Sequence, residues 1–451
     1  MEEMEVVLLT GLPIEERRDF ILTKGKQKRQ LKCDADSVAG SVSQRACVYC
    51  GARVVLNPVT DAVHLVHGPI GCASYTWDIR GSLSSGADLY RNSFSTDLKE
   101  HDIIFGGEKK LARAIDELVR KYRPKLVFVY STCIVGVIGD DLEAVCKAAS
   151  GKHGIEVIPV QSSGFIGNKS AGYRAACDAL MRLIEPGEKK YVIKSKNINY
   201  LGDFNLAGEA WIIKRYLSRM GVDINVVFTG DSSYAALKKA AGASLNIIQC
   251  AGSMIYLASR MEENYGIPYM NVSFVGIEDT SNSLRNIAKA FNDPEMAYKA
   301  EQLIEHETAL VKPAIQRYRE KLEGKKAAVY VGGGFKAVSL IKQFKEIGID
   351  VVMIGTQTGR PEDYRRIGDL VDDGTVILDD ANPAELEKFM LEKGADLLVG
   401  GVKERPLAYK LGIAFIDHNH NRKHPLSGFI GAVNFAEEVY ATVCSPVWNY
   451  I

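Results

Sequence analysis

The chain has 451 residues, 46% of them hydrophobic, and its 56 basic side chains are balanced by 56 acidic ones. This length predicts two to four domains with a large core. The zero net charge lacks the basic excess that is typical of nucleic-acid-binding proteins. No apolar run reaches about eighteen residues and no signal-peptide core is found, so we expect a cytoplasmic protein without a membrane span.

A polar arm at residues 1–40, with a short helix, precedes a regular alternation of strand-like and helix-like segments. Short runs rich in β-branched and aromatic residues predict strands, and apolar residues at helical spacing predict helices. In a first domain (41–187), strands are expected at 125–130 and 154–160, and helices at 141–149 and 171–184. In a second domain (188–323), strands are expected at 192–201, 223–228, 245–248 and 269–272, and helices at 253–264, 280–291 and 293–322.

A third domain (324–424) begins where Gly324 resets the pattern. Its expected strands are 326–331, 351–354, 376–378 and 397–399, and its expected helices are 337–347, 362–371 and 383–393. A C-terminal segment, 425–451, is expected to pack back on the first domain. Strands that alternate with helices imply parallel sheets covered on both faces, so the predicted fold class is α/β with three Rossmann-like domains.

The cysteines number nine, which is odd, and the chain is large and expected in the cytosol. A disulfide framework is therefore a poor interpretation, and metal ligation or simple burial remains for each thiol. They are Cys33, Cys47, Cys50, Cys72, Cys133, Cys146, Cys177, Cys250 and Cys444.

Cys47 and Cys50 form a C-x-x-C pair, but no second pair completes a four-ligand zinc site. Cys72 lies in a Gly- and Pro-rich turn, His67 to Ala73, in which small residues allow a close approach of the backbone. Cys133 directly follows a strand and precedes glycines and a helix capped by aspartate. For each of these cysteines, a buried small hydrophobic residue is the alternative.

Cys250 follows the strand 245–248 and opens a helix, where the helix dipole and free N–H groups favour a thiolate. A core cysteine is about as consistent with the local pattern. The three glycines 332–334 fit neither nucleotide-loop pattern and indicate a turn. His418, His420 and His424 could bind a metal, although solvated loop histidines are more frequent.

Long segments in the same order, from about Arg45 to Trp448, resemble the nitrogenase component-1 family. They are HGPIGCASYTWDIRG (67–81), FSTDL with FGGEKKL (94–111), STCIVGVIGDDLEAVC (131–146), QCAGSMIYLASRMEENYGIPY (249–269) and GGVKERPLAYKLG (400–412). Within the family, TWDIRG, QCAGSM, GVKERPLA, DHNH and SPVW are closest to the branch on which the iron–molybdenum cofactor is assembled.

The resemblance implies three α/β domains around a cluster cavity, and a heterotetramer with a homologous beta-like subunit. It implies that Cys47, Cys72 and Cys133 hold a four-iron cluster shared with that partner. Cys250 would anchor the large iron–sulfur cofactor or its precursor, and Lys403 would lie near the organic acid. Lys169 and Lys336 would offset the negative charge, and Asn419 is a candidate second ligand together with the nearby histidines.

Departures from the catalytic branch matter as much as the matches. Ser427 stands where the catalytic chain has a molybdenum-binding histidine. The catalytic chain has a glutamine and a histidine after its G-F-x-G turn, whereas residues 168–173 here are Asn, Lys, Ser, Ala, Gly and Tyr. Phe335 stands where an arginine is expected, with Lys336 next to it. The sequence therefore predicts a site that anchors the large cluster at one end and later releases it.

The function predicted by the resemblance is a scaffold for cofactor maturation. The precursor would come from an upstream radical enzyme, and molybdenum and homocitrate would be inserted with the help of the nitrogenase Fe protein. Two alternatives stay open: a catalytic alpha subunit of a nitrogenase or nitrogenase-like reductase, and a metal-free binding module on the same fold. Enzymatic activity is undecided, and any reductase activity would be secondary and dependent on the Fe protein and ATP.

Overall fold

The computed structural model describes residues 17–26, 29–33, 46–76, 82–185, 196–418 and 422–450, without the side chains of 87–91 and 449–450. The chain divides into two compact units. The unit called here the cysteine unit comprises 46–309 and 422–431, and the terminal unit comprises 1–45, 310–421 and 432–451. Among the described residues, no helix combines the length and apolar character needed to cross a membrane.

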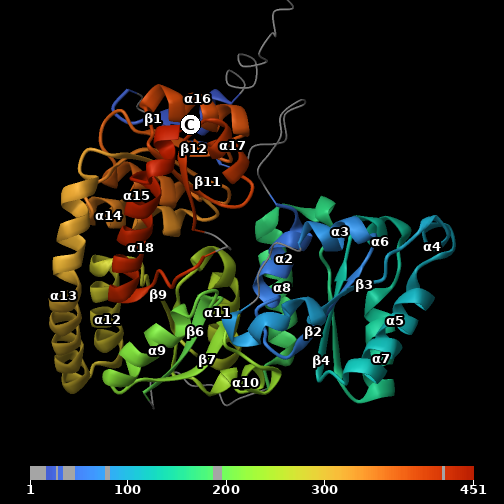
Figure 1. The fold of residues 1–451 in the computed structure, drawn as a ribbon. Helices are drawn as coiled ribbons and strands as arrows, with labels where there is room; N and C mark the ends of the chain where they lie inside the picture. The colour runs from blue at the N-terminus through green and yellow to red at the C-terminus, as the bar shows by residue number, and fades with distance from the viewer. Residues whose placement is uncertain are drawn as a thin grey trace, which may run out of the picture. The chain divides into compact units, whose positions relative to one another are not determined.

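The first sheet of the cysteine unit has four parallel strands in the order β3-β2-β4-β5. Its two faces bury separate apolar clusters, one under α2 and α8 and the other under α5 and α7 (Figure 1). The strands are β2 (Ala62–His67), β3 (Ser93–Ser95), β4 (Leu126–Ser131) and β5 (Glu156–Val160). The helices are α2 (Val48–Leu56), α3 (Ile70–Tyr75), η2 (Leu83–Asn92), α4 (Glu100–Phe105), α5 (Glu108–Tyr122), α6 (Cys133–Ile138), α7 (Leu142–His153), η3 (Gly164–Ile166) and α8 (Lys169–Leu183).

The second sheet of this unit is also parallel, in the order β7-β6-β8-β9. Its strands are β6 (Asn197–Asp203), β7 (Asp223–Thr229), β8 (Leu245–Ile248) and β9 (Tyr269–Asn271). Its helices are α9 (Glu209–Arg219), α10 (Tyr234–Lys238), η4 (Ala240–Gly242), α11 (Ala251–Tyr265) and α12 (Ile277–Phe291). Two longer helices, α13 (Pro294–Leu322) and α18 (Gly428–Val443), have residues in both units.

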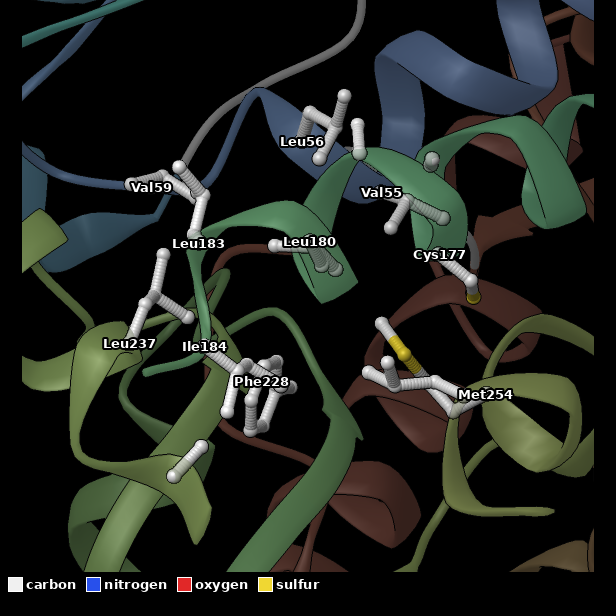
Figure 2. Packing of buried hydrophobic residues seen from close by; sticks show 14 of the residues in the cluster. Val55, Leu56, Val59, Cys177, Leu180, Leu183, Ile184, Phe228, Leu237 and Met254 are labelled. Atoms are coloured by element: carbon white, nitrogen blue, oxygen red, sulfur yellow. The ribbon is translucent and has the colours of Figure 1, made fainter. Parts of the chain in front are cut away.

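One apolar core joins the two sheets of the cysteine unit. Figure 2 shows Val55 and Leu56 of α2, Leu180 of α8 and Met254 of α11 among its members. These side chains are buried, and burial of each stabilises the fold by about 1.5–3 kcal/mol. The loops that follow the strands of both sheets are therefore held on one packed body.

The sheet of the terminal unit has six strands in the order β1-β12-β11-β10-β13-β14. The strands are β1 (Ile21–Thr23), β10 (Lys326–Val331), β11 (Asp350–Thr356), β12 (Val376–Asp379), β13 (Leu397–Gly400) and β14 (Ala414–Asp417). The helices are η1 (Arg18–Phe20), α14 (Gly334–Glu346), α15 (Pro361–Leu370), α16 (Pro383–Lys393), α17 (Arg405–Lys410) and η5 (Pro446–Tyr450). Only β1 is antiparallel among the described strands.

The predicted α/β fold with three parallel sheets is confirmed. The N-terminal arm contributes more than expected, because β1 pairs with β12, and Arg17 forms a buried ion pair with Glu385 at 2.6 Å. The predicted short helix of the arm is only the three residues of η1 among those described. A strand that reaches the sheet edge without a crossover helix can pair antiparallel.

The C-terminal segment contacts elements of the second and third sheets, and its packing on the first domain stays a prediction. Arg422 pairs with Glu209 of α9 at 2.8 Å, and the Gly428 N–H donates to the Phe274 carbonyl at 2.7 Å. Later in α18, Phe435 packs edge-to-face against Phe344 of α14. The contacts recorded for these residues lie with the second and third sheets.

Candidate functional site

Three cysteines lie at the carboxyl end of the first sheet, where parallel sheets usually bind ligands. Cys47 is the N-cap of α2, Cys72 lies in α3 directly after β2, and Cys133 is the first residue of α6 directly after β4. Cys133 is exposed, and Cys47 and Cys72 are half-buried. Buried thiols such as Cys146 and Cys177, whose pKa burial raises to about 12, lie within the core instead.

These three thiols converge around Gly164. Its N–H donates to Cys133 Sγ at 3.2 Å, and a Cβ added to it would lie 3.0 Å from that sulfur and 3.4 Å from Cys47 Cβ. Burial raises the pKa of Cys72, and the nearby thiols of Cys133 and Cys47 raise it further. The structure thus brings together the three cysteines that we singled out, and it does so with a backbone donor aimed at one sulfur.

A buried histidine fastens the loops that carry Cys72 and Cys133. His67 Nδ1 lies 3.0 Å from Thr96 Oγ1, and its Nε2 lies 3.0 Å from Asp140 Oδ2. The hydroxyl of Thr132 donates to the His67 carbonyl at 3.0 Å. Burial lowers the pKa of His67 and Asp140 acts in the opposite direction, so the ring is neutral in its low-dielectric setting.

Serine side chains complete this network under the cysteines. Ser162 donates its N–H to Ser131 Oγ at 2.7 Å and its hydroxyl to the Ser131 carbonyl at 2.8 Å. The Ser163 hydroxyl donates to the Thr132 carbonyl at 3.0 Å. The ends of β4 and β5 are therefore cross-linked by hydrogen bonds immediately before Cys133 and Gly164.

Large apolar side chains are exposed on the helices around the three cysteines. The helices are α3, α4, α6 and η3, and the side chains are Ile70, Ile104, Phe105, Val137, Phe165 and Ile166. Phe105 is 74% exposed and Val137 is 74% exposed, which is unusual for residues of this size. Exposed apolar groups of this kind are typical of interaction surfaces.

Cys250 lies apart from this group, as the N-cap of α11 after β8. Gly202 of β6 has φ of +81°, and a Cβ added to it would lie 2.8 Å from Cys250 Cβ. Neighbouring contacts fix the start of α11 on α8: Cys177 Sγ donates to the Ser253 carbonyl at 3.3 Å, and Tyr256 donates to Asp178 at 2.9 Å.

Lys169, the first residue of α8, provides a positive charge near Cys250. It is 8% exposed, and no carboxylate lies within ion-pair distance of it among the described residues. Its side chain hydrogen-bonds to that of Tyr173, and its Nζ lies 5.9 Å from the centroid of the Tyr173 ring. Burial alone would lower its pKa, but Tyr173, Cys50 and Cys250, when ionised, raise it overall. A buried ammonium without an acid is costly, so this position favours an anionic ligand.

A sequence model described as "Nitrogenase component 1 type Oxidoreductase" matches residues 47–444. The chain belongs to this family. The protein named "Nitrogenase iron-molybdenum cofactor biosynthesis protein NifE" from Clostridium pasteurianum is 62% identical over 97% of each chain. Its namesakes from Methanosarcina barkeri and Klebsiella pneumoniae are 58% and 36% identical, over 97% and 93% of this chain and 97% and 94% of their own.

Solved structures agree with this membership of the nitrogenase component 1 family. The structure titled "Nitrogenase Cp1 at pH 5" superposes with a TM-score of 0.86 at 32% identity, covering 98% of this chain and 97% of that one. "Nitrogenase Cp1 at pH 6.5" gives a TM-score of 0.87 at 31% identity, with the same coverage.

Other residues predicted for a nitrogenase component 1 site lie elsewhere. Lys403 is exposed in the turn after β13 of the terminal unit, and Asn419 lies outside the described residues, as does His420. Lys336 donates to the His418 carbonyl at 3.0 Å, and the buried His418 ring packs against Phe435. Ser427 is buried, whereas His424 is exposed.

Single-ion metal sites do not appear among the described residues: no three His, Cys, Asp or Glu side chains converge tightly enough. This is compatible with a multi-iron cluster, because each thiolate takes a different iron and the sulfurs stand apart. The sequence analysis missed Thr96 and Asp140, whose partner His67 lies 29 and 73 residues away in sequence. It also missed the buried carboxyl pair of Asp203 and Glu209.

Asp203 and Glu209 form that pair at the end of β6, beside Gly202. Both are nearly fully buried, and Arg422 pairs with Glu209. Burial raises the pKa of Asp203 to about 6, and the negative charge of Glu209 adds to the effect. Arg422 pairs with one of these two carboxyl groups, so the second favours the protonated form.

Proposed function

We propose that this chain is the alpha-like scaffold subunit on which the iron–molybdenum cofactor of nitrogenase is matured. The relatives named above carry cofactor biosynthesis in their names, at up to 62% identity over 97% of the chain. The single observation that carries the proposal is that the cysteine unit holds two separate thiol sites. Cys47, Cys72 and Cys133 gather at one, and Cys250 lies beside a buried ammonium at the other.

Residues around the first site fit a four-iron cluster. Cys47, Cys72 and Cys133 supply three soft thiolates, and the Gly164 N–H already donates to one of the sulfurs. A fourth ligand is proposed to come from a homologous beta-like subunit, NifN, because the site is exposed at Cys133. Such a cluster would supply one-electron transfer, and this chain's residues would orient its ligands.

The second site fits an anionic iron–sulfur cargo. Cys250 is proposed as the tether of the precursor cluster, and Lys169 balances its charge from the start of α8. Lys403 is proposed to contact homocitrate, and Asn419 is proposed as a further contact of the cargo. Ser427 in place of a histidine leaves the far end of the cargo without an imidazole ligand, which suits release of the product.

The partners proposed are NifN in a cytoplasmic heterotetramer, the nitrogenase Fe protein and an upstream radical enzyme that delivers the precursor. The exposed side chains of Ile104, Phe105, Val137 and Phe165 support a docking surface around the first site. Apolar side chains at the centre of an interface contribute most of the binding free energy. Cys250 follows β8 of the second sheet, so this proposed docking surface does not include it.

The decisive experiment replaces the tether. In the heteromer purified without oxygen, Cys250→Ala should lose the iron of the cargo while the iron of the first site remains. Cys444→Ala, which removes an exposed thiol of the terminal unit, is the matched control. Iron and sulfide are measured per heteromer, and undiminished cargo iron in Cys250→Ala would overturn the assignment of the tether.

A reductase is the second candidate, favoured by the close superposition on nitrogenase Cp1. Its active site would be the same Cys250 region, with Lys169 and Tyr173 facing the cluster. The test is turnover by the isolated heteromer with Fe protein, ATP and dithionite. Sustained substrate reduction would support the reductase, whereas cargo transfer to a cofactor-free acceptor without turnover supports the scaffold.

A further inference from the structure

Asp140 carries a buried carboxylate just after α6, the short helix that begins with Cys133. We propose that Asp140 is a positioning residue for the first site, which couples the turn between α4 and α5 to the loops that carry Cys72 and Cys133. A displacement of this turn changes the midpoint potential of a cluster bound at the first site. The inference rests on the proposed function, because it requires an iron–sulfur cluster on these cysteines.

The Asp140 carboxylate joins two loops that are far apart in the sequence. The Gly107 N–H donates to both of its oxygens, at 3.0 Å to Oδ1 and 3.1 Å to Oδ2, and His67 Nε2 lies 3.0 Å from Oδ2. The side chains of Asp140 and His67 are 4% and 0% exposed, so water does not compete for these bonds. The Asp141 N–H adds a second link, because it donates to Glu108 Oε1 at 2.8 Å. The turn before α5 is thus bonded to the segment that follows α6.

Hydrogen bonds continue from His67 to the turn that carries Cys72. A carboxylate accepts hydrogen bonds, so His67 Nε2 carries the hydrogen, and Nδ1 accepts one from the Thr96 hydroxyl. The Thr96 oxygen accepts the Gly68 N–H at 3.1 Å, in the same turn as Cys72. The His67 carbonyl accepts the Thr132 hydroxyl, which lies on the second cysteine loop. One continuous path therefore leads from the α4–α5 turn to both loops.

Helix α4 depends on polar contacts for its position, because none of its six residues, all of them described, is buried. Lys110 holds its first turn by donating to Asp102 at 2.6 Å. At its other end, the C-cap Gly106 leads directly into Gly107. An element with few buried contacts moves at a lower free-energy cost than one packed in the core. A movement of α4 therefore reaches Asp140 through the Gly107 N–H.

The packing around Gly107 leaves no room for a side chain unless Asp140 moves. A Cβ added to Gly107 would lie 2.6 Å from Asp140 Oδ2, and 3.0 Å from His67 Cε1 and from Leu98 Cδ2. The backbone of Gly107, with φ of −95° and ψ of −10°, is allowed for alanine as well. Gly107→Ala should therefore fold, and it should displace the end of the Asp140 side chain without changing any charge.

The test is a redox titration of the intact heteromer, purified without oxygen and followed by electron paramagnetic resonance. Gly107→Ala should shift the midpoint potential of the first-site cluster by about 28–59 mV, which is a three- to tenfold change in a one-electron equilibrium. The physical reason is that cluster potentials depend on the hydrogen bonds and the surroundings of the sulfurs. Gly151→Ala, at an exposed helix position where an added Cβ meets open space, is the matched control and should leave the potential unchanged.

A double variant tests whether Asp140 carries the effect. Asp140→Ala removes the carboxylate that Gly107→Ala displaces. In that background, Gly107→Ala should shift the potential by less than about a third of the shift that it causes alone, because residues in one hydrogen-bond network are not independent. Denaturant unfolding of each variant, measured alongside, separates a change of potential from a simple loss of stability.

Each outcome either supports the coupling or overturns it. A wild-type heteromer without iron at the first site would overturn the proposed function, and this inference with it. If the cluster is present and Gly107→Ala lowers stability but leaves the potential at the value of Gly151→Ala, the contact is structural only and the coupling is wrong. If Gly107→Ala shifts the potential equally with and without the Asp140 carboxylate, the effect takes another path, and the inference is likewise overturned.

Discussion

The two thiol sites of the cysteine unit are built in different ways. Around Cys72 and Cys133, the hydrogen bonds of His67, Thr132 and the serines tie three strand ends together, and each of these polar side chains has a partner. Around Cys250, the main polar feature is Lys169, a buried charge without an acid. A fully hydrogen-bonded frame suits a group that stays, whereas an uncompensated charge favours a group that arrives and leaves.

The largest expected effect is at the fixed site. Cys133→Ala in the heteromer removes a proposed ligand whose sulfur already accepts a hydrogen bond from Gly164, so the iron of the first site should be lost almost completely. Iron that depends on Cys250 should remain. Iron analysis with electron paramagnetic resonance checks this, and retention of the first-site signal would contradict the proposed ligand set.

A smaller effect is expected when the hydrogen bonds around Cys72 and Cys133 are removed and the cysteines themselves are kept. His67→Ala deletes two side-chain hydrogen bonds and a buried ring, so the free energy of unfolding should fall by about 2–4 kcal/mol. The midpoint potential of the first cluster should also shift, because its cysteine loops are no longer tied. His67→Asn, which keeps one of the bonds, should restore part of both, and His424→Ala is the exposed control. An unchanged midpoint potential in His67→Ala would show that the hydrogen bonds of His67 contribute to folding only.

Replacing Lys169 should change the stability of the cluster-free chain in the opposite direction to replacing His67. In Lys169→Met the buried charge is gone, so the cluster-free chain should be more stable, by on the order of 1–2 kcal/mol. The same change should speed the loss of cargo iron about tenfold. Denaturant unfolding and chelator kinetics measure the two effects. Lower stability of the cluster-free variant would show that the ammonium already has a partner, against the contrast drawn between the sites.

The smallest effect expected is a pH dependence from Asp203. Its folded pKa of about 6 lies above the ordinary value of 3.8, so the folded state binds a proton that the unfolded state lacks between these pH values. Stability should therefore fall as the pH rises from about 4.5 to 6.5, by on the order of 1 kcal/mol from this group. Asp203→Asn should remove this part of the slope in denaturant unfolding. An identical slope in both proteins would place the proton elsewhere.

Much of the fold follows from local pattern. The strands 326–331 and 245–248 and the helix 383–393 have the predicted bounds, because short apolar runs or a proline start are flanked by clear breakers. In the first sheet, β2 was not predicted, because His64 and His67 interrupt its apolar run. Both are buried there since Tyr130 and Asp140 lie within hydrogen-bond distance of their rings, partners that no local pattern reveals.

The candidate site, too, was only partly predictable from the local sequence pattern. Glycines and strand ends, together with the family resemblance, pointed to Cys72, Cys133 and Cys250, and the structure places each at the carboxyl end of a parallel sheet. The lack of an acid beside Lys169 and its closeness to Cys50 depend on the crossing of α2 and α8. Such a crossing is set by tertiary packing, so spacing along the chain could not predict it.

The most direct measurement is anomalous diffraction at the iron edge from crystals of the heteromer grown without oxygen. Two separate iron peaks are predicted in the cysteine unit. One should lie against the sulfurs of Cys47, Cys72 and Cys133, and a larger one against Cys250. Iron at neither position, or a single peak remote from all four sulfurs, would contradict the two-site assignment.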